Sequence, residues 1–181
     1  PRPIDGVAGG DLNDDGLTDV VVVTNEPTGR NSVWLNTGAG SFRRDSEIGG
    51  NARDVVMGDL NHDGFPDLVL TSNSGARVYL NNGQGRFTLH QHMAASNRSK
   101  SAGLADLNGD GRLDLFLVND GLINGGASTY QPNLVFLYDE AQGLFNDSGQ
   151  ALGTGKSQAV TLGDVNGDDS IDAVVANDGD S

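Results

Sequence analysis

Four copies of one nine-residue acidic loop constrain this chain more than any other feature of its sequence. The copies occupy residues 11–19 (DLNDDGLTD), 59–67 (DLNHDGFPD), 106–114 (DLNGDGRLD) and 164–172 (DVNGDDSID). Each copy has oxygen-bearing side chains at loop positions 1, 3, 5 and 9, and three copies have glycine at position 6. The fold must therefore form the same tight polar turn four times.

The spacing of these oxygen atoms is typical of a calcium site. Ca²⁺ binds six to eight oxygens at about 2.3–2.6 Å, and a tightly curled loop can point alternate residues toward one ion. We predict four Ca²⁺ sites, each with side-chain ligands at positions 1, 3, 5 and 9 and with the backbone carbonyl of position 7. The predicted ligands are Asp11, Asn13, Asp15, Leu17 and Asp19; Asp59, Asn61, Asp63, Phe65 and Asp67; Asp106, Asn108, Asp110, Arg112 and Asp114; and Asp164, Asn166, Asp168, Ser170 and Asp172.

Metals besides calcium, and turns without any metal, fit the four loops less well. Mg²⁺ prefers octahedral geometry and retains several waters, whereas softer metals prefer Cys and His ligands. The chain has no Cys, and its three His do not form a zinc-like pattern. One Asp/Asn/Gly cluster could equally be an ordinary turn, but fourfold recurrence between apolar strands favours metal. In the fourth loop Asp169 replaces the glycine, and we expect weaker binding there rather than none.

An EF-hand, which also uses an Asp-x-Asn-x-Asp-Gly loop, does not fit this chain. It requires a Glu at loop position 12 and a helix on each side, whereas position 12 is Val or Leu in every copy. Short apolar runs rich in β-forming residues follow the loops, at residues 19–23, 67–70, 114–118 and 172–175. The loops are therefore predicted to join strands.

The loop positions also reveal a repeat of larger structural units. The loops begin at residues 11, 59, 106 and 164, so their separations are 48, 47 and 58 residues. Such a period is typical of propellers and solenoids. A further strand pattern follows the first three loops, and a glycine turn and a phenylalanine come after it, which together predict a β-hairpin. These strand patterns lie at residues 31–36, 76–81 and 133–138.

We therefore predict an all-β fold in which each repeat is one four-stranded antiparallel blade of a β-propeller. A single blade cannot bury both of its faces, so neighbouring blades must stack. The repeats are expected at about residues 4–52, 53–100, 101–157 and 158–181, with the last one incomplete. Residues 1–181 would then form one propeller segment of about three and a half blades.

An acidic loop between strands, followed by a strand and an Asn-Gly-x-Gly-x-Phe hairpin, resembles the FG-GAP/VCBS repeat of integrin α-subunit propellers and of many secreted bacterial proteins. The resemblance covers nearly the whole chain. It implies a β-propeller with structural calcium at the blade periphery and with partners bound on the loop faces. Such repeats occur in adhesins, lectins and accessory domains of enzymes, so the fold does not choose among these functions.

The fourth repeat shows only the pattern of its first two strands, whereas the propellers that it resembles usually have seven blades. We expect the chain either to be a piece of a longer protein or to be completed by a neighbouring molecule. An unfinished blade has an edge of unpaired backbone groups, which invites strand addition. Head-to-tail addition that does not close would produce a filament.

The charge of the chain restricts its partners and its location. The sequence has 25 acidic and 11 basic residues, a formal net charge of −14, and 12 of the acidic residues are predicted ligands. Nucleic acid and anionic membranes are not expected as partners, because both require a basic patch. No apolar run is long enough to cross a membrane as a helix. Extracellular calcium modules bind at about 10⁻⁴–10⁻³ M, which predicts an extracellular or cell-surface location.

An insertion at residues 119–132 accounts for the longer third spacing and is the best candidate for a partner site. Insertions in repeat proteins form loops, often on the binding face. We predict that Tyr130 and Asn124 contact a protein or glycan ligand. The aromatic residues that share one repeat position, and are therefore expected to pack within blades, are Trp34, Tyr79 and Phe136.

The sequence thus predicts a calcium-binding extracellular β-propeller module for adhesion or protein assembly. The alternatives are a carbohydrate-binding lectin, an accessory domain of a secreted enzyme, and a filament subunit completed by strand addition. Catalysis within the chain is not expected, because carboxylates that bind calcium are held ionised and cannot act as general acids. Asn97 and Asn146 begin two glycosylation sequons, whose use the sequence leaves open.

Overall fold

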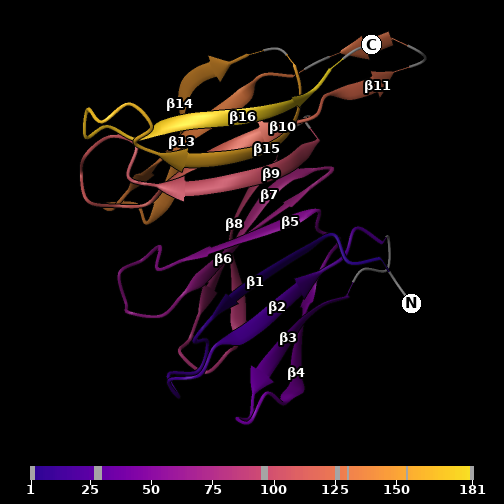
Figure 1. Cartoon of the computed structure of the whole chain (residues 1–181), viewed down its shortest axis with the longest axis vertical. Helices are drawn as coiled ribbons and strands as arrows, with labels where there is room; N and C mark the ends of the chain where they lie inside the picture. The colour runs from indigo at the N-terminus through magenta and orange to yellow at the C-terminus, as the bar shows by residue number, and fades with distance from the viewer. Residues whose placement is uncertain are drawn as a thin grey trace. The chain divides into compact units, whose positions relative to one another are not determined.

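The computed structural model describes residues 3–26, 30–94, 98–124, 127–129, 131–153 and 155–179. All regular structure in these residues is β-strand, which confirms the predicted all-β fold (Figure 1). The described residues contain no helix that could span a membrane. The chain divides into two compact units, which are residues 1–72 with 76–93 and residues 73–75 with 94–181.

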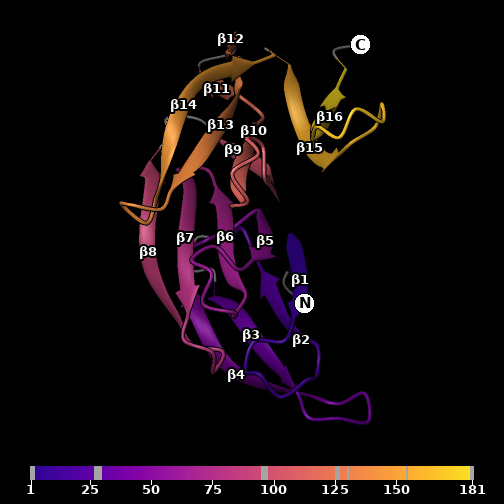
Figure 2. The same ribbon diagram turned by 90° about the vertical axis from the view of Figure 1, so that its left-hand side faces the viewer.

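The first unit is built from two four-stranded sheets. The first sheet has the strand order β1 (Gly6–Gly10), β2 (Asp19–Val23), β3 (Arg30–Asn36) and β4 (Phe42–Gly49). The second has the order β5 (Asp54–Gly58), β6 (Asp67–Ser72), β7 (Gly75–Asn81) and β8 (Phe87–Ala94), and Figure 2 shows these strands side by side. In each sheet the acidic loop joins the first strand to the second, and a glycine turn joins the third to the fourth.

The second unit contains one complete sheet and half of another. The strands β9 (Ser99–Ala105), β10 (Asp114–Asn119), β13 (Asn133–Asp139) and β14 (Leu144–Leu152) form the third four-stranded sheet. The strands β15 (Lys156–Gly163) and β16 (Asp172–Asp178) form a two-stranded antiparallel sheet. Three full sheets and one half-sheet are the blades of a partial β-propeller, which confirms the predicted fold class.

The second strands of the complete sheets supply much of the core. Every residue of β6 and of β10 is buried, in agreement with their nearly continuous apolar sequences. In the first unit, Leu68 and Leu70 of β6 lie in one apolar cluster with Val21 and Val33 of the first sheet. The two sheets therefore stack through side chains that neither sheet could bury alone.

Loop position 2 links the first sheet to the second. Leu12 is fully buried in the same cluster. Its carbonyl oxygen accepts a hydrogen bond from Asn81 Nδ2 at 3.0 Å and another from the Gly85 amide at 2.7 Å. Gly85 belongs to the β7–β8 turn and has φ +69°, a conformation that favours glycine. At the same position of the fourth loop, Val165 is 67% exposed.

The insertion of the third repeat is clamped at its base. It forms a separate two-stranded ribbon, β11 (Leu122–Asn124) and β12 (Ala127–Thr129). Around the ribbon, β10 pairs with β13 in the same register in which β2 pairs with β3. The Asn119 amide donates to Asn133 Oδ1 at 3.0 Å, and Asn119 Nδ2 donates to the Pro132 carbonyl at 2.7 Å. The ribbon therefore leaves the sheet unchanged.

The repeated aromatic residues largely pack as predicted. Tyr79 and Phe136 are buried, and Phe87 packs against the cluster of the first sheet. The prediction that each turn phenylalanine folds back onto a sheet is wrong for Phe42, which is 45% exposed. Phe87 reaches the sheet that precedes its own, and no sheet precedes the first one among the described residues.

Replacement of Leu12 by Ala is expected to lower the free energy of unfolding by about 2–5 kcal/mol, because it leaves a cavity in a closed cluster. Urea denaturation of the full chain measures the change. The matched control is Val165→Ala, at the same loop position but exposed, where we expect a change within about 0.5 kcal/mol. Equal effects of the two substitutions would contradict a linking role for Leu12.

Candidate functional site

The backbone of all four acidic loops curls through two left-handed residues. Position 6 has φ +79°, +91° and +84° at its three glycines, and Asp169 adopts φ +64° in the fourth loop. Asp169 therefore takes the left-handed conformation that its position requires. Position 4 is also left-handed in every loop, a feature that we did not predict. Its residues are Asp14, His62, Gly109 and Gly167, and the two glycines were the available signal.

The first aspartate of each loop accepts hydrogen bonds from the loop backbone. Asp11 Oδ1 accepts from the Asp15 amide at 3.1 Å, and its Oδ2 accepts from the Gly16 amide at 2.7 Å. Asp59, Asp106 and Asp164 make the same pair of bonds in their own loops. Donation from the Gly111 amide is the main cause that lowers the pKa of Asp106, so this carboxylate is readily ionised.

The ninth aspartate of each complete repeat has a second role that we did not predict. Asp67 Oδ2 accepts from the Leu60 amide at 3.0 Å, and its Oδ1 accepts from the Asn81 amide at 2.8 Å. The carboxylate thus ties the loop to the third strand of its sheet. Asp19 and Asp114 make equivalent bonds, and all three side chains are fully buried. Recurrence of Asp at the start of each second strand was the sequence signal for this role.

Burial and like charge act together on these ninth aspartates. Loss of hydration raises the pKa of Asp67, and the negative charges of Asp63 and Asp59 raise it further, although two backbone hydrogen bonds oppose the shift. Burial raises the pKa of Asp114 in the same way. A cation in the loop would favour the ionised form of both groups.

Positions 3 and 5 interact with each other in all four loops. Asn13 Nδ2 donates to Asp15 Oδ2 at 3.0 Å, and the amide of position 7, Leu17, donates to Asp15 Oδ1 at 2.9 Å. The Asn13 Oδ1 atom is buried and has no hydrogen-bond partner in the described structure. A buried oxygen without a donor is costly unless something else satisfies it. A hard cation that prefers oxygen ligands fits this position.

The carboxylates do not converge on one point in this structure. Within the described residues, no group of three or more His, Asp or Glu side chains is arranged to hold a metal ion. Backbone amides instead engage the oxygens of positions 1, 5 and 9, as the bonds above show. The loops therefore provide the oxygen-only donor set and the curled backbone that calcium requires, but not a converged ligand shell. The position-7 residues Phe65, Arg112 and Ser170 donate their amides to position 5 as Leu17 does.

The predicted partner site is described only in part. Asn124 lies on β11, where it pairs with Ala127 of β12. Tyr130 and the sequon residue Asn97 lie outside the described residues. Contact of Tyr130 and Asn124 with a ligand therefore stays a prediction.

Comparison with protein families agrees with the repeated loops and sheets. The FG-GAP-like repeat model matches residues 11–70 and 59–117, which together span more than half of the chain. The chain belongs to the FG-GAP-like repeat family. Each matched segment begins at the first aspartate of one acidic loop and extends past the next loop into the following strand. The family thus includes the loop, the hairpin and the connection between consecutive blades.

The FG-GAP chain is also similar to a solved lectin structure. That protein is an Agrocybe aegerita lectin, described for its specific recognition of non-reducing terminal N-acetylglucosamine. The similarity has a TM-score of 0.50 and 25% sequence identity, and it covers 82% of this chain but 38% of the lectin chain. The chain therefore spans well under half the length of this relative. No curated protein matches the sequence.

Replacement of Asp67 by Asn should destabilise the FG-GAP sheet by about 1–3 kcal/mol, because the new NH₂ group faces a backbone N–H donor. The control is Asp172→Asn, since Asp172 accepts only the Val165 amide, at 3.1 Å, among the described residues, and one amide oxygen can still accept it. Both variants are compared by urea denaturation in a calcium chelator, which separates the hydrogen bonds from metal binding. A larger loss for Asp172→Asn than for Asp67→Asn would refute the two-bond role.

Proposed function

We propose that this chain is part of an extracellular FG-GAP propeller that recognises a glycan ligand and holds structural Ca²⁺ in its four acidic loops. The observation that supports recognition most directly is the similarity to the Agrocybe aegerita lectin over 82% of this chain. Glycan binding was the predicted alternative to general adhesion, and the lectin similarity now favours it. Adhesion through a glycan would combine the two roles.

Calcium is proposed as a structural ion and not as a reactant. In each loop the residues at positions 1, 3, 5, 7 and 9 would hold it through oxygen atoms. Bound calcium would supply positive charge beside three carboxylates, which repel one another in its absence. Three observations support this role: the unpartnered Asn13 oxygen, the raised pKa values of Asp67 and Asp114, and the fourfold loop curl.

A recognition role suits these loops better than catalysis. A general acid must hold a proton near neutral pH, whereas hydrogen bonds from the backbone lower the pKa values of Asp106 and Asp164. Calcium would lower them further. We therefore propose that the chain binds its ligand without reacting with it. The millimolar calcium outside cells matches the affinity of extracellular calcium modules, about 10⁻⁴–10⁻³ M.

Calcium is expected to raise the melting temperature of the full chain. At ten times the dissociation constant each site contributes about 1.4 kcal/mol, so four sites should raise Tm by about 10 °C or more. Differential scanning calorimetry in chelator and then in millimolar calcium measures this shift. No change in Tm across the titration would show that the loops are only turns.

Asp169→Gly provides a gain-of-function version of the calcium experiment. Glycine adopts the left-handed backbone without strain, so the variant should bind calcium more tightly in the fourth loop and show a larger calcium-dependent rise in Tm. Any gain in Tm already present in chelator reflects the backbone alone and is subtracted. A variant whose calcium-dependent shift equals that of the native chain would contradict a metal site in this loop.

Glycan recognition is tested on an array that includes glycans with terminal N-acetylglucosamine. We expect saturable binding to at least one glycan class, reduced at least tenfold by Tyr130→Ala or Asn124→Ala without a change in Tm. Phe42→Ala is the control, since Phe42 is an exposed aromatic residue on a different turn. Absence of binding to every glycan, with the protein folded, would favour a protein ligand instead.

A further inference from the structure

The half-sheet β15–β16 lacks the hydrogen bonds that complete the other sheets. β6 and β16 both begin with the ninth aspartate of an acidic loop, yet every residue of β6 is buried while most of β16 is exposed. In the complete second sheet, Asp67 Oδ1 accepts the Asn81 amide of β7. In the half-sheet, no described residue donates to Asp172 Oδ1. Figure 2 shows β16 at the outer side of its pair.

A second acceptor is open in the same unit. In the first unit, the carbonyl of Leu12 accepts both Asn81 Nδ2 and the Gly85 amide from the β7–β8 hairpin. Leu107 holds the same position in the third loop. No described residue donates to its carbonyl oxygen. One asparagine at the place of Asn81 would satisfy both Asp172 and Leu107.

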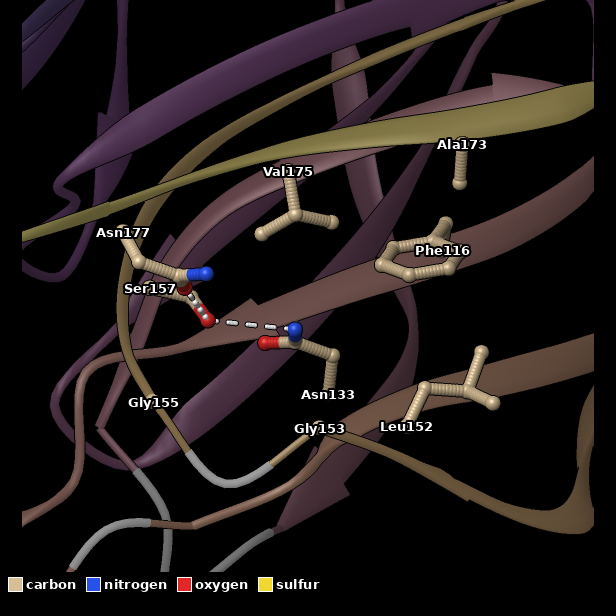
Figure 3. A pocket seen from close by; sticks show the side chains of 9 residues that line it. All are labelled: Phe116, Asn133, Leu152, Gly153, Gly155, Ser157, Ala173, Val175 and Asn177. Atoms are coloured by element: carbon tan, nitrogen blue, oxygen red, sulfur yellow. Dashed lines mark hydrogen bonds between the residues drawn. The ribbon is translucent and has the colours of Figure 1, made fainter.

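Two cavities lie where the side chains of such a hairpin would pack. One, of about 240 Å³, is lined among others by Phe116, Leu152, Gly153 and Val175 (Figure 3). In the first unit the corresponding place holds Tyr79, whose hydroxyl donates to the Gly49 carbonyl at 3.1 Å. Tyr79 has no counterpart among the described residues of the half-sheet, and the cavity is the space that it would fill.

The other cavity corresponds to the seat of the hairpin turn. It has a volume of about 230 Å³, and Leu107 and Leu137 are among its lining residues. Their counterparts Leu12 and Leu35 belong to the cluster against which Phe87 of β8 packs. The Gly85 turn also lies against them, since a Cβ there would come within 3.3 Å of Leu35 Cδ2. The second cavity is therefore the place of a turn glycine and its phenylalanine.

We propose that the edge of β16 and these two cavities form a docking site for one more FG-GAP β-hairpin, of the pattern aromatic-Leu-Asn-x-Gly-x-Gly-x-Phe. Its asparagine amide donates to Asp172 Oδ1 and its asparagine side chain donates to the Leu107 carbonyl. The aromatic residue lies opposite Ala173, as Trp34 lies opposite Val20 in the first sheet. Added main-chain hydrogen bonds along β16 give affinity, and the two cavities give specificity.

The hairpin comes from a segment outside residues 1–181 and not from a second copy of this chain. All three hairpins of the chain, β3–β4, β7–β8 and β13–β14, are already paired within their own sheets. A second copy would have to unfold one of its blades to supply the strand. The docking site does not depend on the proposed glycan binding or on calcium.

A synthetic peptide with the sequence of residues 75–90 (GARVYLNNGQGRFTLH) tests the docking site. Fluorescence anisotropy of the labelled peptide should show saturable one-to-one binding to the full chain. Peptides with Asn81→Ala or Tyr79→Ala should bind at least tenfold more weakly. Absence of saturable binding to the folded chain, or equal binding of all three peptides, would overturn the proposal.

Protein variants locate the bound peptide. Ala173→Phe fills the seat of the aromatic residue and should abolish binding, whereas Val174→Phe, on the opposite face of the same strand, should leave the affinity within twofold. Both positions are exposed, so both variants should fold. Light scattering of the chain without peptide provides the last control. A dimer that Ala173→Phe dissolves would show that a second copy takes the site, and would overturn the choice of occupant.

Discussion

The buried carboxylate at loop position 9 is the interaction on which each complete blade depends. One side chain accepts an amide from the acidic loop and another from the third strand, as at Asp67 with Leu60 and Asn81. A neutral residue of the same shape cannot accept both bonds. Loop geometry and strand pairing are therefore coupled, and a change that distorts the loop is felt in the sheet.

The same carboxylate also explains why an acidic loop is useful even where it costs stability. Burial of Asp67 near Asp59 and Asp63 raises its pKa, so ionisation in the folded state is penalised. The penalty falls if a cation lies beside the three groups. A protein built this way is stabilised by the ion concentration of its surroundings as well as by its own core.

Much of the fold could be predicted because its signals are local and repeated. The nine-residue loops, the apolar second strands and the glycine turns each lie within a short stretch, and recurrence separates them from chance. The missed features depend on neighbours in space. Asp67 meets Asn81 across 14 residues and Leu12 meets Asn81 across 69, and Phe42 is exposed because no sheet precedes its own among the described residues. No residue pattern within one loop contains that information.

The clamp at the base of the β11–β12 ribbon has a consequence for how such proteins diversify. Asn119 and Asn133 close the chain onto itself before and after the ribbon, so the length of the segment between them is independent of strand register. Mutations there escape the packing constraints that act on the blades. A lineage could lengthen, shorten or replace this ribbon to follow a changing ligand while the rest of the molecule evolves slowly.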